Sequence, residues 1–231
     1  MSESTNKLKK ITEFWCSQSY KKTMFFNTLK EEKLSKLQAA QFHYNAEIVI
    51  QNTLESMKEA GKSSEMLGEE DLSDFFKMKV VEETGHDKWA KEDYLKLGLT
   101  TDEKLQLSLS SGALKLINKL HQMARFSPFS MLAYVFFGEY HYTIIGPEVA
   151  ELYESSVKTS SSLVHSHGVL DVEHVKEDIK AIDKLMPDGD TFKKAQQDLI
   201  ECMNYQIEFY NEVCKIIVSK EDIKNEKRIS A

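Results

Sequence analysis

The chain has 231 residues, enough for one complete hydrophobic core, and we expect a single domain over residues 1–231. Its net charge of −7 gives no basic footprint for nucleic acid, and no apolar run approaches the ~18 residues that a membrane helix needs. Only nine glycines and three prolines are present, which disfavours turn-rich β folds and favours an all-α fold.

The first half of the chain predicts three helices, over residues 2–20, 31–60 and 71–97. Four apolar residues of the first helix should share one side: Leu8, Ile11, Phe14 and Trp15. Gly61 should end the second helix and Gly98 the third, because glycine is common just after a helix. A polar connector is expected after Gly61.

The second half predicts more helix, over residues 105–145, 147–183 and from Asp190 or Thr191 to about Val218. Thr100 and Glu103 have capping-box spacing, which marks a helix start. Ser127–Pro128 should kink or split the first stretch, and Gly146–Pro147 should end it. A break is expected around residues 160–162, a turn at Pro187–Asp188–Gly189 and a charged tail from about residue 219. The whole is an all-α bundle of about seven helices.

Two histidines and an aspartate are spaced for one helix face late in the chain. His167, Asp171 and His174 follow intervals of four and three, which places them on a single stripe. Two imidazoles and a carboxylate on one face can bind a transition metal. The alternative is a surface face with an internal Asp–His pair, and His165 is a less well-placed substitute.

A second cluster lies earlier, where Glu83 and His86 are three residues apart and so share a helix face. Glu82, four residues before His86, is the alternative to Glu83, and its ordinary interpretation is a solvated side chain. Gly85 lowers helix stability here and indicates close packing or an opened site.

Two single carboxylates complete the set. Glu139 lies in an aromatic, apolar segment, where burying a carboxylate is costly unless it is paired or bound to metal. Glu47 is a further candidate on the long second helix, with a solvated face as the equal alternative. A di-iron site needs several carboxylates and a few imidazoles from facing helices. The candidate metal ligands are Glu47, Glu83, His86, Glu139, His167, Asp171 and His174. Three tyrosines could support them: Tyr44, Tyr140 and Tyr142.

These clusters, in this order, resemble the haem-oxygenase-like di-iron oxidases and oxygenases, which share a seven-helix fold with thiaminase-II-like proteins and the pyrroloquinoline-quinone synthase. The Glu83-x-x-His86 pair, followed by Trp89, looks like the family's third-helix motif, and Glu139 falls midway between the two histidine motifs. His167-x₃-Asp171-x₂-His174 looks like the late-helix motif. The resemblance covers residues of about 40–180 and also matches Glu47 to a first-helix carboxylate.

The resemblance implies an O₂-dependent oxidoreductase with two iron ions that oxidises a small organic substrate, such as an amino acid, an amine or a fatty acid. Oxidative decarboxylation, C–C cleavage and N-oxygenation are the reactions it suggests. An electron donor is a further expected partner, and a homodimer is compatible with the fold. The substrate, the choice between iron and manganese, and the use of a protein tyrosine as reactant stay open.

Two other functions remain as alternatives. A metal-independent, thiaminase-II-like enzyme would need a cysteine nucleophile, but Cys16, Cys202 and Cys214 lie in no catalytic motif. Their odd number, without a signal peptide, indicates the reducing cytoplasm. The second alternative is a non-catalytic helical interaction protein, in which the clusters are surface features. A haem site, with His43 as the axial ligand, is disfavoured because carboxylates suit a porphyrin face poorly.

Overall fold

The computed structural model describes residues 1–216, and within them the chain forms ten α-helices and no strand. The helices are α1 (Glu3–Lys22), α2 (Met24–Lys30), α3 (Lys36–Met66), α4 (Glu70–Glu83), α5 (His86–Lys96), α6 (Thr101–Lys104), α7 (Ser111–Phe126), α8 (Pro128–Val157), α9 (Ser162–Leu185) and α10 (Asp190–Val213). The predicted all-α class is confirmed, with more helices than the seven expected. No described helix is long and apolar enough to cross a membrane.

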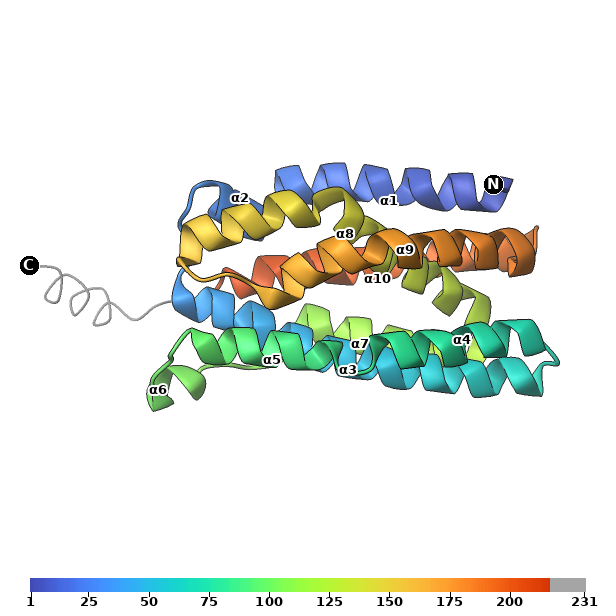
Figure 1. Cartoon of the computed structure of the whole chain (residues 1–231), viewed down its shortest axis with the longest axis horizontal. Helices are drawn as coiled ribbons and strands as arrows, with labels where there is room; N and C mark the ends of the chain where they lie inside the picture. Colours follow the sequence, from blue (N-terminus) through green and yellow to red (C-terminus); the bar gives the residue numbers. More distant parts are fainter. Residues whose placement is uncertain (217–231) are drawn as a thin grey trace, which may run out of the picture.

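The long helices run roughly along the longest axis of the molecule (Figure 1). α4 and α5 follow one another end to end alongside α3, and α1 lies at the opposite edge of the bundle. α8 packs against α9, α10 and α1, and α7 lies between α3 and α10. The polypeptide therefore places α4, α5, α8 and α9 around a shared interior.

The middle of α8 is the centre of the core. All seven residues from Met131 to Phe137 are buried, so this segment is enclosed on every side. Gly112 of α7 lets a neighbouring helix approach closely, because a Cβ there would lie 2.3 Å from the backbone nitrogen of Phe209 in α10. α8 thus runs through the core, and α7 and α10 pack backbone to backbone beside it.

Several predicted boundaries are correct. Ser127–Pro128 splits α7 from α8, the Thr100–Glu103 capping box starts α6, and Gly98 follows the end of α5 with a φ of 64°. The break expected near residue 160 lies between Val157 and Ser162. Two other predicted bounds differ from the structure. The helical stretch predicted from residue 105 begins only at Ser111, after the short α6, and α10 ends at Val213 rather than near Val218. The charged tail predicted from about residue 219 lies outside the described residues.

The helix ends predicted at Gly61 and at Gly146–Pro147 are wrong. α3 continues through Gly61 because this position is buried against α4, where Phe76 Cβ lies at an ordinary contact distance of 3.6 Å from the position of a Cβ. α8 continues through Pro147, which is exposed, so that the carbonyl group left without a donor can bond to water. Burial of Val149 and Tyr153 on the following turns stabilises this continuation.

A further correction concerns α1, where Phe14 does not share the buried side of the helix. Its side chain is 68% exposed, whereas Leu8 and Trp15 are buried. Phe14 follows Leu8 by six residues, about a third of a turn away from the stripe that the buried pair defines.

Candidate metal centre

The junction between α4 and α5 brings Glu83 and His86 together. The sequence predicted one continuous helix here, but α4 ends at Glu83 and α5 begins at His86. Between them Gly85 has a φ of 100°, a left-handed conformation that glycine adopts without steric cost. His86 Nδ1 lies 2.8 Å from Glu83 Oε2. The pair therefore depends on a break rather than on helical spacing.

α9 carries the histidine–aspartate stripe. His167 Nδ1 lies 3.3 Å from Asp171 Oδ1, and His174 Nδ1 lies 3.8 Å from the same oxygen. Asp171 is fully buried, whereas His165, the less well-placed substitute, is exposed. Asp171 therefore links two imidazoles on the inner side of α9.

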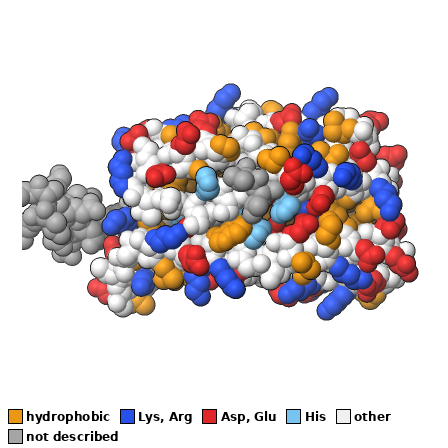
Figure 2. Space-filling model, viewed as in Figure 1, with side chains coloured by type: hydrophobic (Ala, Val, Ile, Leu, Met, Phe, Trp, Pro, Cys, Tyr) orange, Lys and Arg blue, Asp and Glu red, His pale blue; other side chains and the backbone are white. Residues whose placement is uncertain are grey.

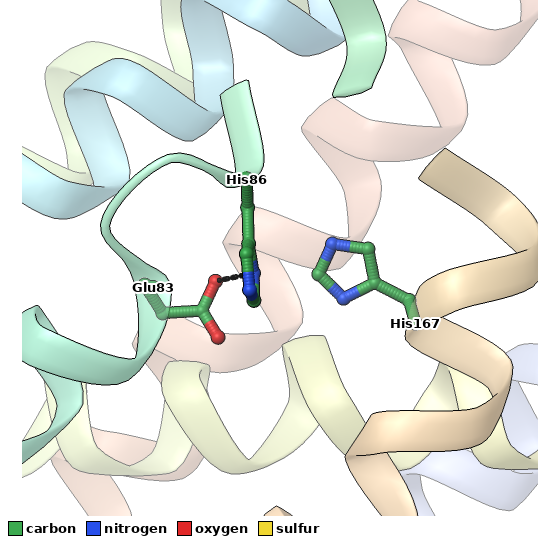
Figure 3. A group of neighbouring side chains, drawn as sticks. All are labelled: Glu83, His86 and His167. Atoms are coloured by element: carbon green, nitrogen blue, oxygen red, sulfur yellow. Dashed lines mark hydrogen bonds and ion pairs between the residues drawn. The ribbon is translucent and has the colours of Figure 1, made fainter. Parts of the chain in front are cut away.

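Glu83, His86 and His167 form a first group of ligand atoms, all within 4.8 Å of one another. Figure 3 shows the three side chains converging from the end of α4, the start of α5 and α9. Trp89 stacks on His86 with ring centroids 4.1 Å apart, and Tyr142 stacks on His167 at 5.0 Å. These aromatic rings restrict the orientation of both imidazoles.

Glu82, Glu139 and His174 form a second group with the same 4.8 Å limit. The fully buried Lys79 lies among its carboxylates, with Nζ 3.1 Å from Glu139 Oε1 and 3.0 Å from Glu82 Oε2. Nζ is also 3.0 Å from Asp178 Oδ1 on α9. The second group therefore already contains one positive charge.

The charges of the two groups are unbalanced. The two groups and their neighbours contain five carboxyl groups, Glu82, Glu83, Glu139, Asp171 and Asp178, and one lysine. That lysine, Lys79, pairs with three of them: Glu82, Glu139 and Asp178. Burial raises the pKa of Glu139 well above its usual value, and the neighbouring carboxylate of Asp178 raises it further. Burial opposes ionisation of Glu83 as well, but hydrogen bonding and charge from His86 and His167 outweigh it and lower its pKa. A cation would relieve this excess of negative charge.

Several buried ligand atoms have no hydrogen-bond partner within the described chain. They include Glu83 Oε1, Asp171 Oδ2 and His174 Nδ1. Each unpaired buried polar atom costs about 1–3 kcal/mol, and a metal ion would satisfy all of them. The donor set of imidazole and carboxylate also matches what iron and manganese accept. The first group fits a metal ion directly. The second group fits one only after Lys79 releases the carboxylate oxygens of Glu82 and Glu139.

The centre is reached from the protein surface. The side chains of His174 and Glu82 are 18% and 22% exposed to solvent. Figure 2 shows histidine and acidic side chains beside one another near the middle of one face. Two members of the second group therefore reach solvent.

The structure brings six of the seven predicted ligands together and leaves Glu47 apart. Glu47 Oε1 lies 3.5 Å from Gln51 Nε2 and 3.8 Å from Lys91 Nζ, outside both groups. Of the three tyrosines, Tyr142 contacts a candidate ligand. Tyr140 instead donates a hydrogen bond to Glu13 on α1, and Tyr44 lies on α3 three residues before Glu47.

Sequence reasoning missed Lys79 and Asp178, although both continue stripes that it identified. Lys79 precedes Glu83 by four residues, and Asp178 follows His174 by four, so each lies one turn from a predicted ligand. Glu82, treated as a solvated alternative, takes part in the second group.

An apolar cavity of about 120 Å³ adjoins the centre. Glu83, Glu139 and His167 form part of its wall, and the rest is mainly apolar side chains from α3, α7, α8 and α10. Ala46, Val49, Leu116, Val135 and Phe209 are among them. A molecule bound there would place an apolar body against these side chains and one end against the candidate ligands.

Comparison with known proteins identifies the fold. No family model matches the chain, and no curated protein matches it. A domain of unknown function with a heme oxygenase-like fold from Shewanella denitrificans has a TM-score of 0.81 at 17% identity, over 91% of this chain and 92% of that one. Heme oxygenase-1 from the cyanobacterium Synechocystis, in complex with heme, has a TM-score of 0.69 at 10% identity, over 99% and 97%.

A third solved structure, a CADD-like protein of unknown function from Nostoc punctiforme, has a TM-score of 0.66 at 12% identity, over 92% of this chain and 99% of that one. At these identities the likeness concerns the arrangement of helices. The chain has an all-α, haem-oxygenase-like fold.

Proposed function

We propose that this protein is a non-haem iron oxidoreductase that uses O₂ to oxidise a small organic substrate. The first iron ion would bind Glu83, His86 and His167, and the second would bind Glu82, Glu139 and His174, with Asp171 between them. The observation that carries the proposal is the set of buried, unpartnered ligand atoms contributed by α4 and α9. A surface cluster would satisfy these atoms with water, and a purely structural cluster would pair them with one another.

The chain's own residues prepare the histidines for binding. Asp171 Oδ1 accepts a hydrogen bond from His167 Nδ1, and Glu83 Oε2 accepts one from His86 Nδ1. Each bond leaves Nε2 of the imidazole with its lone pair free, which fixes the tautomer that a metal requires. Trp89 and Tyr142 hold the ring planes and keep water from one side. Bound iron would supply the one-electron chemistry that O₂ needs.

The cavity supports a substrate with an apolar body. Its wall is mainly aliphatic and aromatic, and its charged or titratable lining includes three candidate ligands, Glu83, Glu139 and His167. A fatty acid, an amine or an amino acid with an apolar side chain would fit this distribution, and an external electron donor would complete the reaction. The free thiols of all three cysteines are compatible with the cytoplasm.

The test is an iron count followed by exposure to O₂. The protein is purified without oxygen, loaded with Fe(II), freed of excess metal, and mixed with oxygenated buffer while its visible absorption is recorded. We expect wild type to retain iron and to give a transient visible band. His167→Ala and Glu83→Ala should lose most of the bound iron and the band.

His165→Ala is the matched control, because His165 lies on the same helix two residues away and is exposed. It should behave as wild type. The proposal is rejected if wild type retains no iron, or if the His165 and His167 variants lose iron equally. Parallel loading with Mn(II) decides between the two metals.

The two alternative chemistries find less support. A thiol nucleophile is disfavoured because Cys16 and Cys202 are buried, and burial raises the pKa of Cys16 to about 12. An axial haem ligand at His43 is disfavoured because its Nε2 lies 2.9 Å from the Tyr153 hydroxyl, in a fully buried contact.

A further inference from the structure

Lys79 is a buried lysine, a rare feature in protein interiors. Its side chain has no exposure, and its ammonium lies between three helices. α4 itself supplies Glu82, α8 supplies Glu139 and α9 supplies Asp178, each with an oxygen 3.0–3.1 Å from Nζ. A buried charge persists only when it is paired, and these carboxylates provide the pairing.

Two of those partners are the oxygens that the second metal ion needs. Glu139 Oε1 lies 3.1 Å from Lys79 Nζ and 3.8 Å from His174 Nδ1, so the ammonium and an ion at His174 would share it. A divalent ion and an ammonium a few ångströms apart repel one another strongly at low dielectric. Lys79 therefore already supplies part of the positive charge that an ion would bring.

The first group differs in this respect. Among the described residues, Glu83 pairs with His86 and Asp171 pairs with His167 and His174, and neither carboxylate has a lysine or arginine within ion-pair distance. The two groups thus offer similar ligands, but only the second group has a lysine paired with its carboxylates.

We propose that Lys79 is a tethered cation at the second metal position, so that the protein binds one metal ion at Glu83, His86 and His167 and accepts a second only when Lys79 releases Glu82 and Glu139. This inference rests on the proposed metal centre. Asp178 is the residue that would retain the ammonium after release, because it is fully buried and is not part of either ligand group. Lys79 thereby sets how many metal ions the chain carries.

The experiment compares wild type with Lys79→Met, a neutral side chain of similar length. Both proteins are titrated with Fe(II) without oxygen, and with Mn(II), by calorimetry, with metal analysis after dialysis. Wild type should bind one ion, with the second at least about tenfold weaker, because the ammonium opposes it. Lys79→Met should bind the two ions with similar affinities and retain both after dialysis.

Lys119→Met is the matched control, since Lys119 is a nearly buried lysine paired with Asp198 and Glu201 away from the centre. It should bind metal as wild type does. The inference is overturned if wild type binds two ions with equal affinity, or if folded Lys79→Met keeps the wild-type difference between the two affinities. Either result would leave the proposed function intact. Absence of all metal binding in wild type would reject the proposed function itself.

Asp178→Asn keeps the test decisive if Lys79→Met does not fold. Without the Asp178 charge, the ammonium depends on Glu82 and Glu139 alone, so the second ion should bind more weakly than in wild type. Tighter binding of the second ion by Asp178→Asn would contradict the inference.

Discussion

Trp89 lies against both imidazoles of the first ligand group. Its ring stacks on His86 at 4.1 Å and meets His167 edge-on at 5.7 Å, as centroid distances. Iron ions quench indole emission at short range. We expect Fe(II) or Fe(III) binding to lower the tryptophan fluorescence of wild type by a saturable amount, which a titration would measure.

The chain contains only two tryptophans, so the assignment is direct. Trp89→Phe should abolish most of the saturable quenching, whereas Trp15→Phe should retain it, because Trp15 packs on Phe137 and His141 instead. Equal quenching in both variants would place the metal elsewhere in the molecule.

At the scale of the element, the α4–α5 junction positions the first group through one backbone conformation. Gly85 has a φ of 100° and open space around its Cβ position, so Gly85→Ala meets no clash and only backbone strain. A left-handed alanine costs about 1–2 kcal/mol. We expect a matching loss of stability in urea and, because relaxation of the junction would separate His86 from Glu83, weaker metal binding.

Gly68→Ala separates these two effects. Gly68, between α3 and α4, has a φ of 76° and equally open surroundings, but it lies outside the ligand groups. It should lose similar stability and bind metal normally. A similar loss of metal binding in both variants would show that general destabilisation, rather than the junction, governs the site.

The start of α1 is attached to the end of α9 by Asp183. Its carboxylate accepts hydrogen bonds from Thr5 Oγ1 and the Ser2 backbone nitrogen, and these bonds lower its pKa. When folding lowers the pKa of a carboxyl group, the ionised group stabilises the fold at pH values above its unfolded-state pKa, here about 3.8. This stabilisation is lost as the pH falls below that value. Asp183→Asn should therefore reduce the urea midpoint near pH 6, and the difference from wild type should shrink toward pH 2.

Asp188→Asn is the reference for this measurement, since Asp188 is an exposed acid in the following turn. It should have little effect at either pH. A difference between wild type and Asp183→Asn that does not change with pH would mean that geometry, not charge, holds the two helices.

At the scale of the whole molecule, the sequence predicts helical class, the Ser127–Pro128 division and the register of His167, Asp171 and His174. These features depend on local spacing and on proline chemistry, which a sequence displays directly. Spacing cannot reveal which polar side of a helix faces inward, and Lys79 reads as an ordinary solvated lysine until α8 and α9 surround it. Glu47 has suitable spacing, but its helix directs it toward Lys91 rather than toward α9.

The bundle divides two tasks: α4, α5 and α9 supply most of the candidate ligands, whereas α3 and α8 supply most of the cavity wall. Ala46 on α3 lines that cavity and belongs to neither ligand group. Ala46→Phe should fill the space and block an apolar ligand while leaving the metal content unchanged. Straight-chain carboxylates and amines of increasing length are suitable probes, measured by the shift in melting temperature of metal-loaded protein.

In wild type the shift should grow with chain length, because each buried methylene contributes about 0.8 kcal/mol. In Ala46→Phe it should be small at every length, with the iron count of wild type as the check that the centre is intact. Equal shifts in both proteins would mean that these molecules bind elsewhere. Loss of iron in Ala46→Phe would instead mean that the cavity wall and the metal centre are mechanically coupled through α8, the helix that borders both and carries Glu139.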